Sequence, residues 1–253
     1  MKVVFDARFC DSGYADDNAA MPGRMEAAMS GLTSSPWNCV APPSATLAQL
    51  RLAHDETYIA QIATDTSRFA MASLAAGGAI LAARLARSGA PTFACIRPPG
   101  HHASPSEAWG HCTFSNMALA LLVLRSEQYI ESAFVLDIDA HTGDGTRKSL
   151  AAWPQAEVFN PFASDAKEYL ELVEARLDAI EHTEILAVSA GFDAYKLDVG
   201  HKLDTPDFER IGTLVRKASE RLCCGRRFAV LEGGYYLKDL GANVLAFCRG
   251  FAG

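Results

Sequence analysis

Four side chains that can bind a metal or move a proton lie within the segment LDIDAHTGDGT, which directly follows the apolar residues SAFV. They are Asp137, Asp139, His141 and Asp144. Residues two apart on a strand point the same way, so Asp137, Asp139 and His141 would line one face in successive layers. A carboxylate is costly to bury without a partner. From this segment alone two interpretations stay open: acids that cap turns at a strand end, or ligands of a metal.

A further metal ligand is available in SAGFDA, where Asp193 follows an apolar run. Asp139 and Asp193 would each offer a carboxylate oxygen, and His141 would offer an imidazole nitrogen. Two carboxylates and one imidazole with an open fourth position can form a catalytic Zn²⁺ site. Asp137 would lie one layer deeper, where its carboxylate needs a hydrogen-bond donor.

Two adjacent imidazoles, His101 and His102, follow the turn Pro98–Gly100. Placed beside a metal-bound water, each would need a partner that fixes its tautomer and raises its basicity, and Asp137 and Asp144 are available. The alternative is that both histidines are solvated in a surface turn.

Tyr235 follows Gly233 and Gly234. A tyrosine on a glycine turn at a strand end can point its hydroxyl into a pocket and donate to a developing oxyanion. The alternative is a core aromatic residue, a place that the adjacent Tyr236 could also fill.

Short apolar runs alternate with runs of helical length along the chain. Five runs have the composition of strands covered on both faces: Lys2–Phe5, Thr92–Ile96, Ser132–Asp139, Glu184–Ala190 and Arg227–Glu232. Helices are expected over Ala72–Arg87 and Phe114–Arg125. Two more are expected after the N-cap residues Ser164 and Thr205, the second with Pro206 at its first position.

This alternation predicts one α/β/α layered domain over residues 1–253. In such folds ligands bind at the carboxyl ends of the strands. At their carboxyl ends, four of the predicted strands continue into the segments RPPGHHA, DIDAHTGDG, SAGFDA and EGGYY. Polar groups that are far apart in the sequence should therefore converge on one edge of the sheet.

Composition limits the function. The chain has 253 residues, 49% of them hydrophobic and 21% charged, and its net charge of −7 disfavours broad binding to nucleic acid phosphates. We therefore expect no nucleic acid partner. No signal peptide is expected, because Met1 leads directly into a strand-like segment, and no membrane partner is expected, because no apolar run approaches a membrane span in length. The seven cysteines are scattered, so free thiols in the cytoplasm and no cysteine-ligated zinc are expected.

The motifs RPPGHHA, GHCTFSNMALA, LDIDAHTGDGT, SAGFDA and EGGYY occur in this order and together resemble those of the histone deacetylase superfamily. The resemblance includes its bacterial histone deacetylase-like and acetylpolyamine amidohydrolase members. It implies an arginase/deacetylase-like α/β/α sandwich with a mostly parallel sheet of about eight strands. It also implies Zn²⁺-dependent, or Fe²⁺-dependent, hydrolysis of an N-acyl amide of an amine such as acetyl-lysine or an acetylpolyamine.

The resemblance assigns roles to individual residues. It implies metal ligands at Asp139, His141 and Asp193, and tandem catalytic histidines at His101 and His102 with partners Asp137 and Asp144. It implies that Tyr235 polarises the substrate carbonyl, that Asp198 is a second acid and not a ligand, and that substrate contacts come from Gly110, His111 and Gly233.

Two departures from the family pattern affect the substrate tunnel. His111 stands where an aromatic wall residue is usual, and the segment after Thr146 contains no Y-P-G-T-G-like turn. The resemblance therefore leaves a structural K⁺ open. Two interpretations of Trp109, Trp153 and Phe162 also stay open: they partly replace the wall, or they are ordinary core or surface aromatics. Either the mouth of the site is open, or a homo-oligomer covers it, and we favour the oligomer.

Three function classes follow. The first and favoured one is a zinc amidohydrolase. The second is a ureohydrolase of the same fold, which needs two metals and a GGDH-like motif that this chain does not contain. The third is a degenerate member that binds acyl amines without turnover.

Overall fold

The computed structural model describes residues 1–253 and contains one seven-stranded sheet in which all neighbouring strands are parallel. The strand order is β2-β1-β3-β7-β6-β4-β5. The strands are β1 (Lys2–Val4), β2 (Asn38–Val40), β3 (Thr92–Ala94), β4 (Ala133–Asp137), β5 (Ala156–Phe159), β6 (Leu186–Ala190) and β7 (Arg227–Leu231). The predicted α/β class is confirmed, with seven strands where the resemblance implied about eight.

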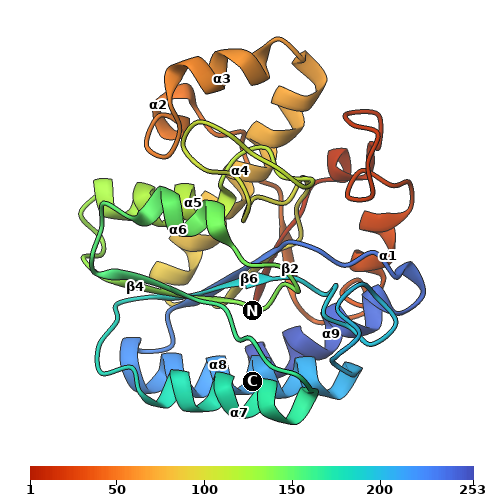
Figure 1. Ribbon diagram of the computed structural model, residues 1–253, viewed down its shortest axis with the longest axis vertical. Coiled ribbons are helices and arrows are strands. Elements are labelled where there is room, and N and C mark those ends of the chain that lie inside the picture. Colours follow the sequence, from red (N-terminus) through yellow and green to blue (C-terminus); the bar gives the residue numbers. More distant parts are fainter.

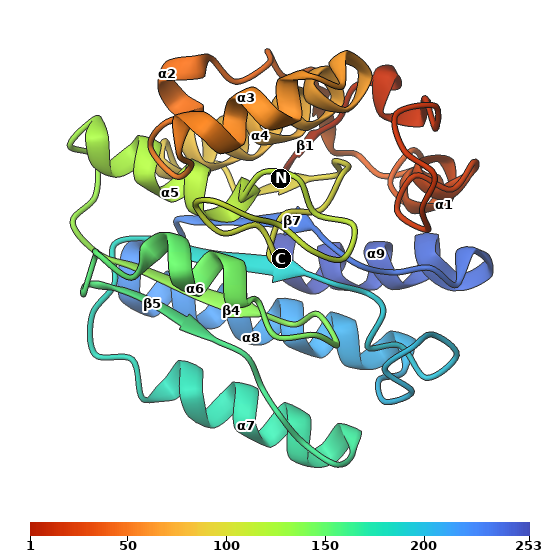
Figure 2. The same cartoon turned by 45° about the horizontal axis from the view of Figure 1, so that its top comes forward.

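Helices cover both faces of this sheet (Figures 1 and 2). One face carries α4, α5 and α6, with α2 and α3 outside α4, and the other carries α7, α8 and α9; α1 packs against α9. The α-helices are α1 (Arg24–Ser30), α2 (Leu47–Leu50), α3 (Glu56–Ala63), α4 (Thr66–Arg87), α5 (Asn116–Ser126), α6 (Asp144–Leu150), α7 (Ala166–Asp178), α8 (Thr205–Cys223) and α9 (Leu237–Ala252), and a 3₁₀ helix spans Ala7–Cys10.

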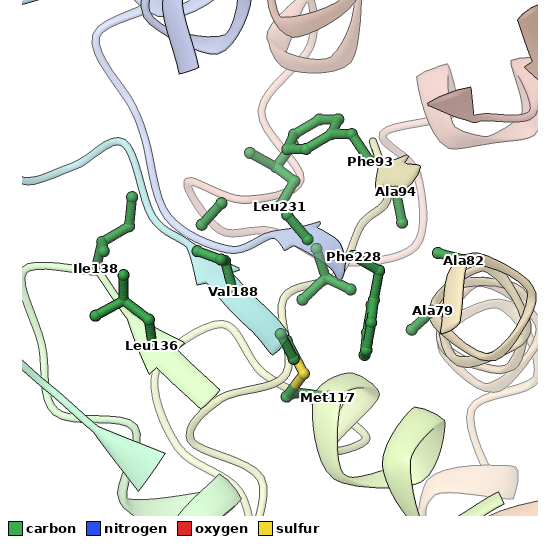
Figure 3. Packing of buried hydrophobic residues seen from close by; sticks show 14 of the residues in the cluster. Ala79, Ala82, Phe93, Ala94, Met117, Leu136, Ile138, Val188, Phe228 and Leu231 are labelled. Carbon is green, nitrogen blue, oxygen red and sulfur yellow. The ribbon is translucent and has the colours of Figure 1, made fainter. Parts of the chain in front are cut away.

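Apolar side chains of the central strands fill the space between the layers. Figure 3 shows Phe228 of β7 beside Met117 of α5 and Ala79 of α4. On the opposite face Phe93 of β3 meets Phe247 of α9, with ring centroids 6.2 Å apart. Because these strands are buried on both faces, almost every residue in them is apolar, as the sequence pattern predicted.

Helix α4 is long and apolar enough to cross a membrane by length and composition, contrary to the expectation that no segment approaches that length. In the fold 72% of its most apolar window is buried. It packs closely: a Cβ atom on Gly77 would lie 1.9 Å from the carbonyl oxygen of Pro43. The apolar composition of α4 is thus that of a core helix between the sheet and its outer loops.

All five predicted strands are present, and their ends differ from prediction by at most two residues. The sequence reading missed β2 and β5, which form the two edges of the sheet and are partly exposed, so neither is a continuous apolar run.

The predicted helix starts were wrong by a few residues. Aspartates take the N-cap positions: Asp165 caps α7, Asp204 caps α8, and Asp65 caps α4, which begins at Thr66, six residues before the predicted Ala72. The Asp65 and Asp165 carboxylates accept the backbone N–H groups of Arg68 and Glu168, and at α8 the Asp207 carboxylate accepts the Asp204 N–H. The expected cap Ser164 therefore lies one residue before the cap of α7, and Thr205 is the first residue of α8. Pro206 consequently takes the second helical position.

The four strands whose ends carry the polar motifs are neighbours, in the order β3-β7-β6-β4. Parallel pairing brings their carboxyl ends to one edge of the sheet. The loops after Ala94, Asp137, Ala190 and Leu231 therefore meet above the centre of the sheet, as expected for this class of fold.

Candidate metal and catalytic site

Asp139, His141 and Asp193 form a cluster at this edge, with ligand atoms that all lie within 4.8 Å of one another. His141 Nδ1 is 3.0 Å from Asp139 Oδ1 and 3.1 Å from Asp193 Oδ2. Both carboxylates are buried and the imidazole is exposed toward the pocket. The structure thus brings together the three residues that the sequence singled out as metal ligands.

The electrostatics of this cluster favour a bound cation. Burial and the neighbouring Asp139 carboxylate raise the pKa of Asp193 to about 7, because two adjacent buried carboxylates resist ionising together. Hydrogen bonds to these carboxylates raise the pKa of His141 to about 10. Asp193 Oδ2 is buried and lies 3.1 Å from His141 Nδ1. A divalent cation would neutralise both acids and bind their oxygens, so the donor set fits zinc.

Glycines let the carboxylates pack this closely. A Cβ atom on Gly233 would lie 2.6 Å from Asp139 Oδ2 and 2.8 Å from Asp193 Oδ2. The Gly233 N–H donates to Asp139 Oδ2 at 2.9 Å. Gly233 also lines the pocket, so its backbone serves both the cluster and the cavity.

Strand β4 ends at Asp137, so Asp139 and His141 lie in the following loop and not on the strand face predicted from the two-residue period. Asp137 Oδ1 accepts the Asp139 N–H (3.1 Å), and Asp139 Oδ1 accepts the His141 N–H (3.0 Å). Such bonds to the backbone two residues on are typical of Asx turns. The turn-capping and metal-binding interpretations are therefore compatible, because the carboxylates that shape the loop also form the cluster.

His101 is paired with a deep carboxylate. Its Nδ1 lies 3.1 Å from Asp137 Oδ2, and its Nε2 lies 3.7 Å from Asp139 Oδ1. Burial by itself lowers the pKa of His101, but the negative charges of Asp139 and Asp137 outweigh burial and raise it well above the usual range. His101 and Asp137 are both buried, so this pair lies beneath the cluster.

His102 is paired with a carboxylate near the surface. Its Nδ1 lies 2.9 Å from Asp144 Oδ1. Asp144 is the first residue of α6, and its side chain is 34% exposed. Burial, followed by the neighbouring His101, lowers the pKa of His102 to about 4, so the ring is neutral near pH 7. A neutral ring that donates from Nδ1 leaves Nε2 free to accept a proton.

Tyr235 lines the same pocket and its phenol is held in the protonated form, because burial raises its pKa far above the usual value. Its backbone is fixed by Asp198, whose Oδ2 accepts the N–H groups of Tyr235 (2.5 Å) and Tyr236 (2.7 Å). The Arg24 guanidinium lies 5.4 Å from the centre of the Tyr235 ring. Asp198 is thus a positioning acid outside the metal cluster.

These groups surround a pocket of about 180 Å³. Besides the histidines and Tyr235, its lining includes Trp109, Gly110 and His111. Gly110 adopts φ +63°, and a Cβ atom there would lie 3.2 Å from His102 Cδ2. The glycine therefore permits both the backbone turn and the close approach to His102.

Comparison with known proteins identifies the family. The model of the histone deacetylase domain matches residues 19–169 and 155–251 of the chain. This chain belongs to the histone deacetylase domain family.

Individual histone deacetylase relatives agree with that placement. A probable deacetylase of Methanothermobacter thermautotrophicus is 31% identical over 73% of this chain and 66% of its own length. The histone deacetylase-like amidohydrolase of Pseudomonas aeruginosa is 30% identical over 66% of this chain and 54% of its own length. An acetylpolyamine amidohydrolase of Burkholderia pseudomallei is 30% identical over 70% of this chain and 61% of its own length. The match thus spans about half to two thirds of these relatives.

The fold is also that of a histone deacetylase domain. The crystal structure of the HDA15 HD domain superposes with a TM-score of 0.86, and the match covers 100% of this chain and 91% of that one at 21% identity. The loops that carry the motifs are therefore set on a histone deacetylase framework.

The structure of this histone deacetylase family member decides which candidate wall residues reach the pocket. Of the three aromatics considered, only Trp109 lines the pocket. Trp153 is buried and donates its indole N–H to the carbonyl of Glu131 (3.0 Å), so it is a core residue. Phe162 is 92% exposed and lies outside the pocket lining. His111 is half-buried, with Nδ1 3.6 Å from Asp17 Oδ1, and its ring centre lies 5.5 Å from that of Tyr235.

Glu232 is a buried site residue that the sequence reading did not single out. Its Oε2 accepts the backbone N–H groups of Gly100 (2.7 Å) and His101 (3.2 Å), and its Oε1 accepts the Ser189 hydroxyl (3.2 Å). Burial raises its pKa to about 7. Glu232 thus ties the histidine turn to the ends of β6 and β7. The acid in EGGYY, at the end of an apolar strand, was the signal that could have revealed it.

Arg24 secures the same region from the N-terminal part of the chain. It is buried and donates to the carbonyl groups of Gly234 (2.9 Å) and Glu232 (2.6 Å). No role was predicted for Arg24 from the sequence. Its role depends on a contact across the whole chain length, which the local sequence does not indicate.

A second group of metal-capable atoms consists of His101, Cys112 and Glu232. Its members already have partners: the Glu232 carboxylate accepts two backbone N–H groups, and Cys112 Sγ accepts the His102 N–H at 3.4 Å. Burial raises the pKa of Cys112 well above the usual value, so it stays a thiol. This group is therefore a poor metal site beside the Asp139–His141–Asp193 cluster.

Proposed function

We propose that this protein is a zinc-dependent amidohydrolase that removes a small acyl group, acetyl in the first instance, from an acylated amine. The observation that supports it is one juxtaposition. The Asp139–His141–Asp193 cluster, two His–Asp pairs and Tyr235 all surround a single pocket at the carboxyl ends of four neighbouring strands.

The protein groups divide the chemistry among them. A zinc ion held by Asp139, His141 and Asp193 would supply Lewis acidity to the site. His102, neutral and oriented by Asp144 through Nδ1, is placed to accept a proton at Nε2 from the attacking water and to return it to the leaving amine.

Tyr235 has the properties of the oxyanion donor. Its raised pKa keeps the hydroxyl protonated, and Asp198 fixes the backbone on which it is mounted. A preorganised donor of this kind stabilises the negative charge that develops on the acyl oxygen during attack. His101 has its Nδ1 committed to Asp137, so it holds a fixed place under the cluster.

The pocket supports a small acyl group. Its volume of about 180 Å³ is below the range of sites that enclose drug-sized ligands. The relatives include enzymes named for acetylpolyamines as well as histone deacetylase-like amidohydrolases. Acetylated lysine side chains and acetylated polyamines are therefore the amines to test first.

A panel of acyl amines tests the proposal. The zinc-supplied protein is incubated with acetyl-lysine peptide, acetylpolyamines and their longer-chain acyl analogues, and the liberated amine is measured. Turnover of an acetyl substrate that disappears in His102→Ala is expected. No amine release from any member, with metal bound, would instead favour a non-catalytic acyl-amine-binding protein.

A further inference from the structure

Trp109 makes two contacts with the His102–Asp144 pair that a simple pocket-wall residue does not need. Its indole stacks on the His102 ring, with ring centroids 3.5 Å apart and 29° between the planes. Its Nε1–H donates to both oxygens of Asp144, at 3.1 Å and 3.2 Å. One side chain thus touches both the imidazole and the carboxylate that orients it.

The stacking leaves His102 little freedom to rotate. The His101 ring centre lies 3.9 Å from that of His102, at 39° between the planes. Two rings cannot occupy one face at these distances, so His102 lies between His101 and Trp109. The backbone of Gly110 approaches the edge of the ring, since a Cβ atom there would lie 3.2 Å from His102 Cδ2.

The hydrogen bond to Asp144 matters because this carboxylate has few other restraints. Asp144 lies at the first position of α6 with a side chain that is 34% exposed. The ammonium group of Lys148 lies 3.8 Å from Asp144 Oδ2. Asp144 Oδ1 accepts from His102 Nδ1 and from the Trp109 indole together. A half-exposed carboxylate without the indole would rotate into water and release the imidazole.

We propose that Trp109 is a positioning residue that acts through Asp144 to hold His102 in its reactive orientation. This inference rests on the proposed function, in which His102 is the base. It predicts an effect on the rate of the chemical step, whereas a wall residue that only contacts substrate would change binding.

The test compares four proteins: wild type, Trp109→Phe, Asp144→Asn and the double variant. Phenylalanine keeps an aromatic face on His102 and removes the N–H donor. The kcat of Trp109→Phe should fall about tenfold, as expected for loss of a hydrogen bond to a charged group, with KM changed by less than about twofold. In the Asp144→Asn background the same substitution should change kcat by less than about twofold, because the two residues act as a unit.

Two kinetic outcomes would overturn the inference. A raised KM with an unchanged kcat would make Trp109 a wall residue. Equal losses of kcat in both backgrounds would show that Trp109 does not act through Asp144. Trp37→Phe is the matched control, because Trp37 lies outside the pocket and should keep wild-type kinetics.

An NMR measurement tests the contact without turnover. The chain has three tryptophans, so indole N–H resonances can be assigned by substitution. The Trp109 resonance should move upfield and exchange faster with water in Asp144→Asn, and an unchanged resonance would refute the contact. If the wild type hydrolyses no acyl amine, the proposed function fails, and this resonance still decides whether Trp109 holds Asp144.

Discussion

His101 and His102 are neighbours in the chain, yet their carboxylate partners occupy different environments. Asp137, the partner of His101, is fully buried at the end of β4. Asp144, the partner of His102, begins α6 and is 34% exposed. The deep pair is fixed by the sheet, whereas the outer pair depends on a short helix and on Trp109. In the proposed function the first histidine is accordingly part of the framework and the second is the group that exchanges protons.

The largest effect should come from removing the outer imidazole. His102→Ala deletes the proposed base and should lower kcat by about 10³-fold or more, near the upper part of what general acid–base catalysis contributes. The metal content should not change, because His102 lies outside the Asp139–His141–Asp193 cluster. Steady-state kinetics with metal analysis check this, and a kcat within tenfold of wild type would move the proton transfer to another residue.

Removal of the Tyr235 hydroxyl tests whether the oxyanion is stabilised by Tyr235 and not by either histidine–aspartate pair. Tyr235→Phe should lower kcat by about 10²–10³-fold with the metal retained, as for loss of one oxyanion donor. Tyr236→Phe, a change at the adjacent ring, is the control and should have little effect. Near-normal kcat in Tyr235→Phe would show that another group polarises the substrate.

The two aspartates allow the most direct test of the contrast. Asp137→Asn replaces a buried acceptor of two hydrogen bonds by an amide that can satisfy only one, so it should lower the free energy of unfolding by about 1–3 kcal/mol. The Asp144 side chain is 34% exposed. Asp144→Asn should therefore change the free energy of unfolding by less than about 0.5 kcal/mol, but it should lower kcat by about 10–10²-fold.

Denaturant unfolding of both variants in a chelating buffer, together with their kcat values, decides the matter. Equal decreases in the free energy of unfolding of Asp137→Asn and Asp144→Asn would contradict the distinction between the two pairs. In that distinction the His101–Asp137 pair is structural and the His102–Asp144 pair exchanges protons.

A third buried imidazole shows what a purely structural histidine looks like. The Nδ1 atom of His54 donates to the Ser104 carbonyl (3.0 Å), and its Nε2 atom accepts the Ser115 N–H (2.9 Å). Burial lowers its pKa from 6.5 to about 4. Between these values the unfolded chain binds the proton more readily, so the stability that neutral His54 contributes is complete above pH 6.5 and is lost as the pH falls toward 4.

His54→Gln tests this structural role, because the glutamine amide offers a hydrogen-bond donor and an acceptor and does not titrate. The variant should lose less stability than wild type between pH 7 and pH 4, by about 3 kcal/mol at most. Thermal unfolding against pH measures the difference. Parallel pH profiles would show that His54 is not the buried neutral group that the structure indicates.

The sequence was sufficient for the parts of the molecule that follow a local period. β3, β4, β6 and β7 are apolar because helices cover both of their faces, and their ends predicted which motifs would meet. β2 and β5 escaped prediction because an edge strand has one strand neighbour and tolerates polar residues. Helix starts were displaced because an aspartate competed with the predicted serine or threonine for the cap.

Within the site, the residues in motifs could be predicted and the contacts between loops could not. Asp139, His141 and Asp193 meet because parallel strands β4 and β6 end side by side. Two contacts depend on loop conformations that follow no sequence period. They are the hydrogen bond from the Trp109 indole to Asp144 and the hydrogen bonds by which Glu232 holds the backbone of the histidine turn. For the same reason Trp153 and Trp109 were both candidates for the pocket wall, although one is core and the other lines the site.

The central claim is that a metal bound by the Asp139–His141–Asp193 cluster is required for the His102–Asp144 pair to act in hydrolysis. Metal replacement tests this claim most directly. Chelated wild-type protein should hydrolyse no acetylated amine and should regain turnover as zinc is added, reaching a plateau at one equivalent per chain. Asp193→Ala should neither hold zinc at that stoichiometry nor regain turnover, while Asp165→Ala, a helix-cap control outside the cluster, should behave as wild type. Turnover that survives chelation, or full metal content and activity in Asp193→Ala, would contradict the proposed site.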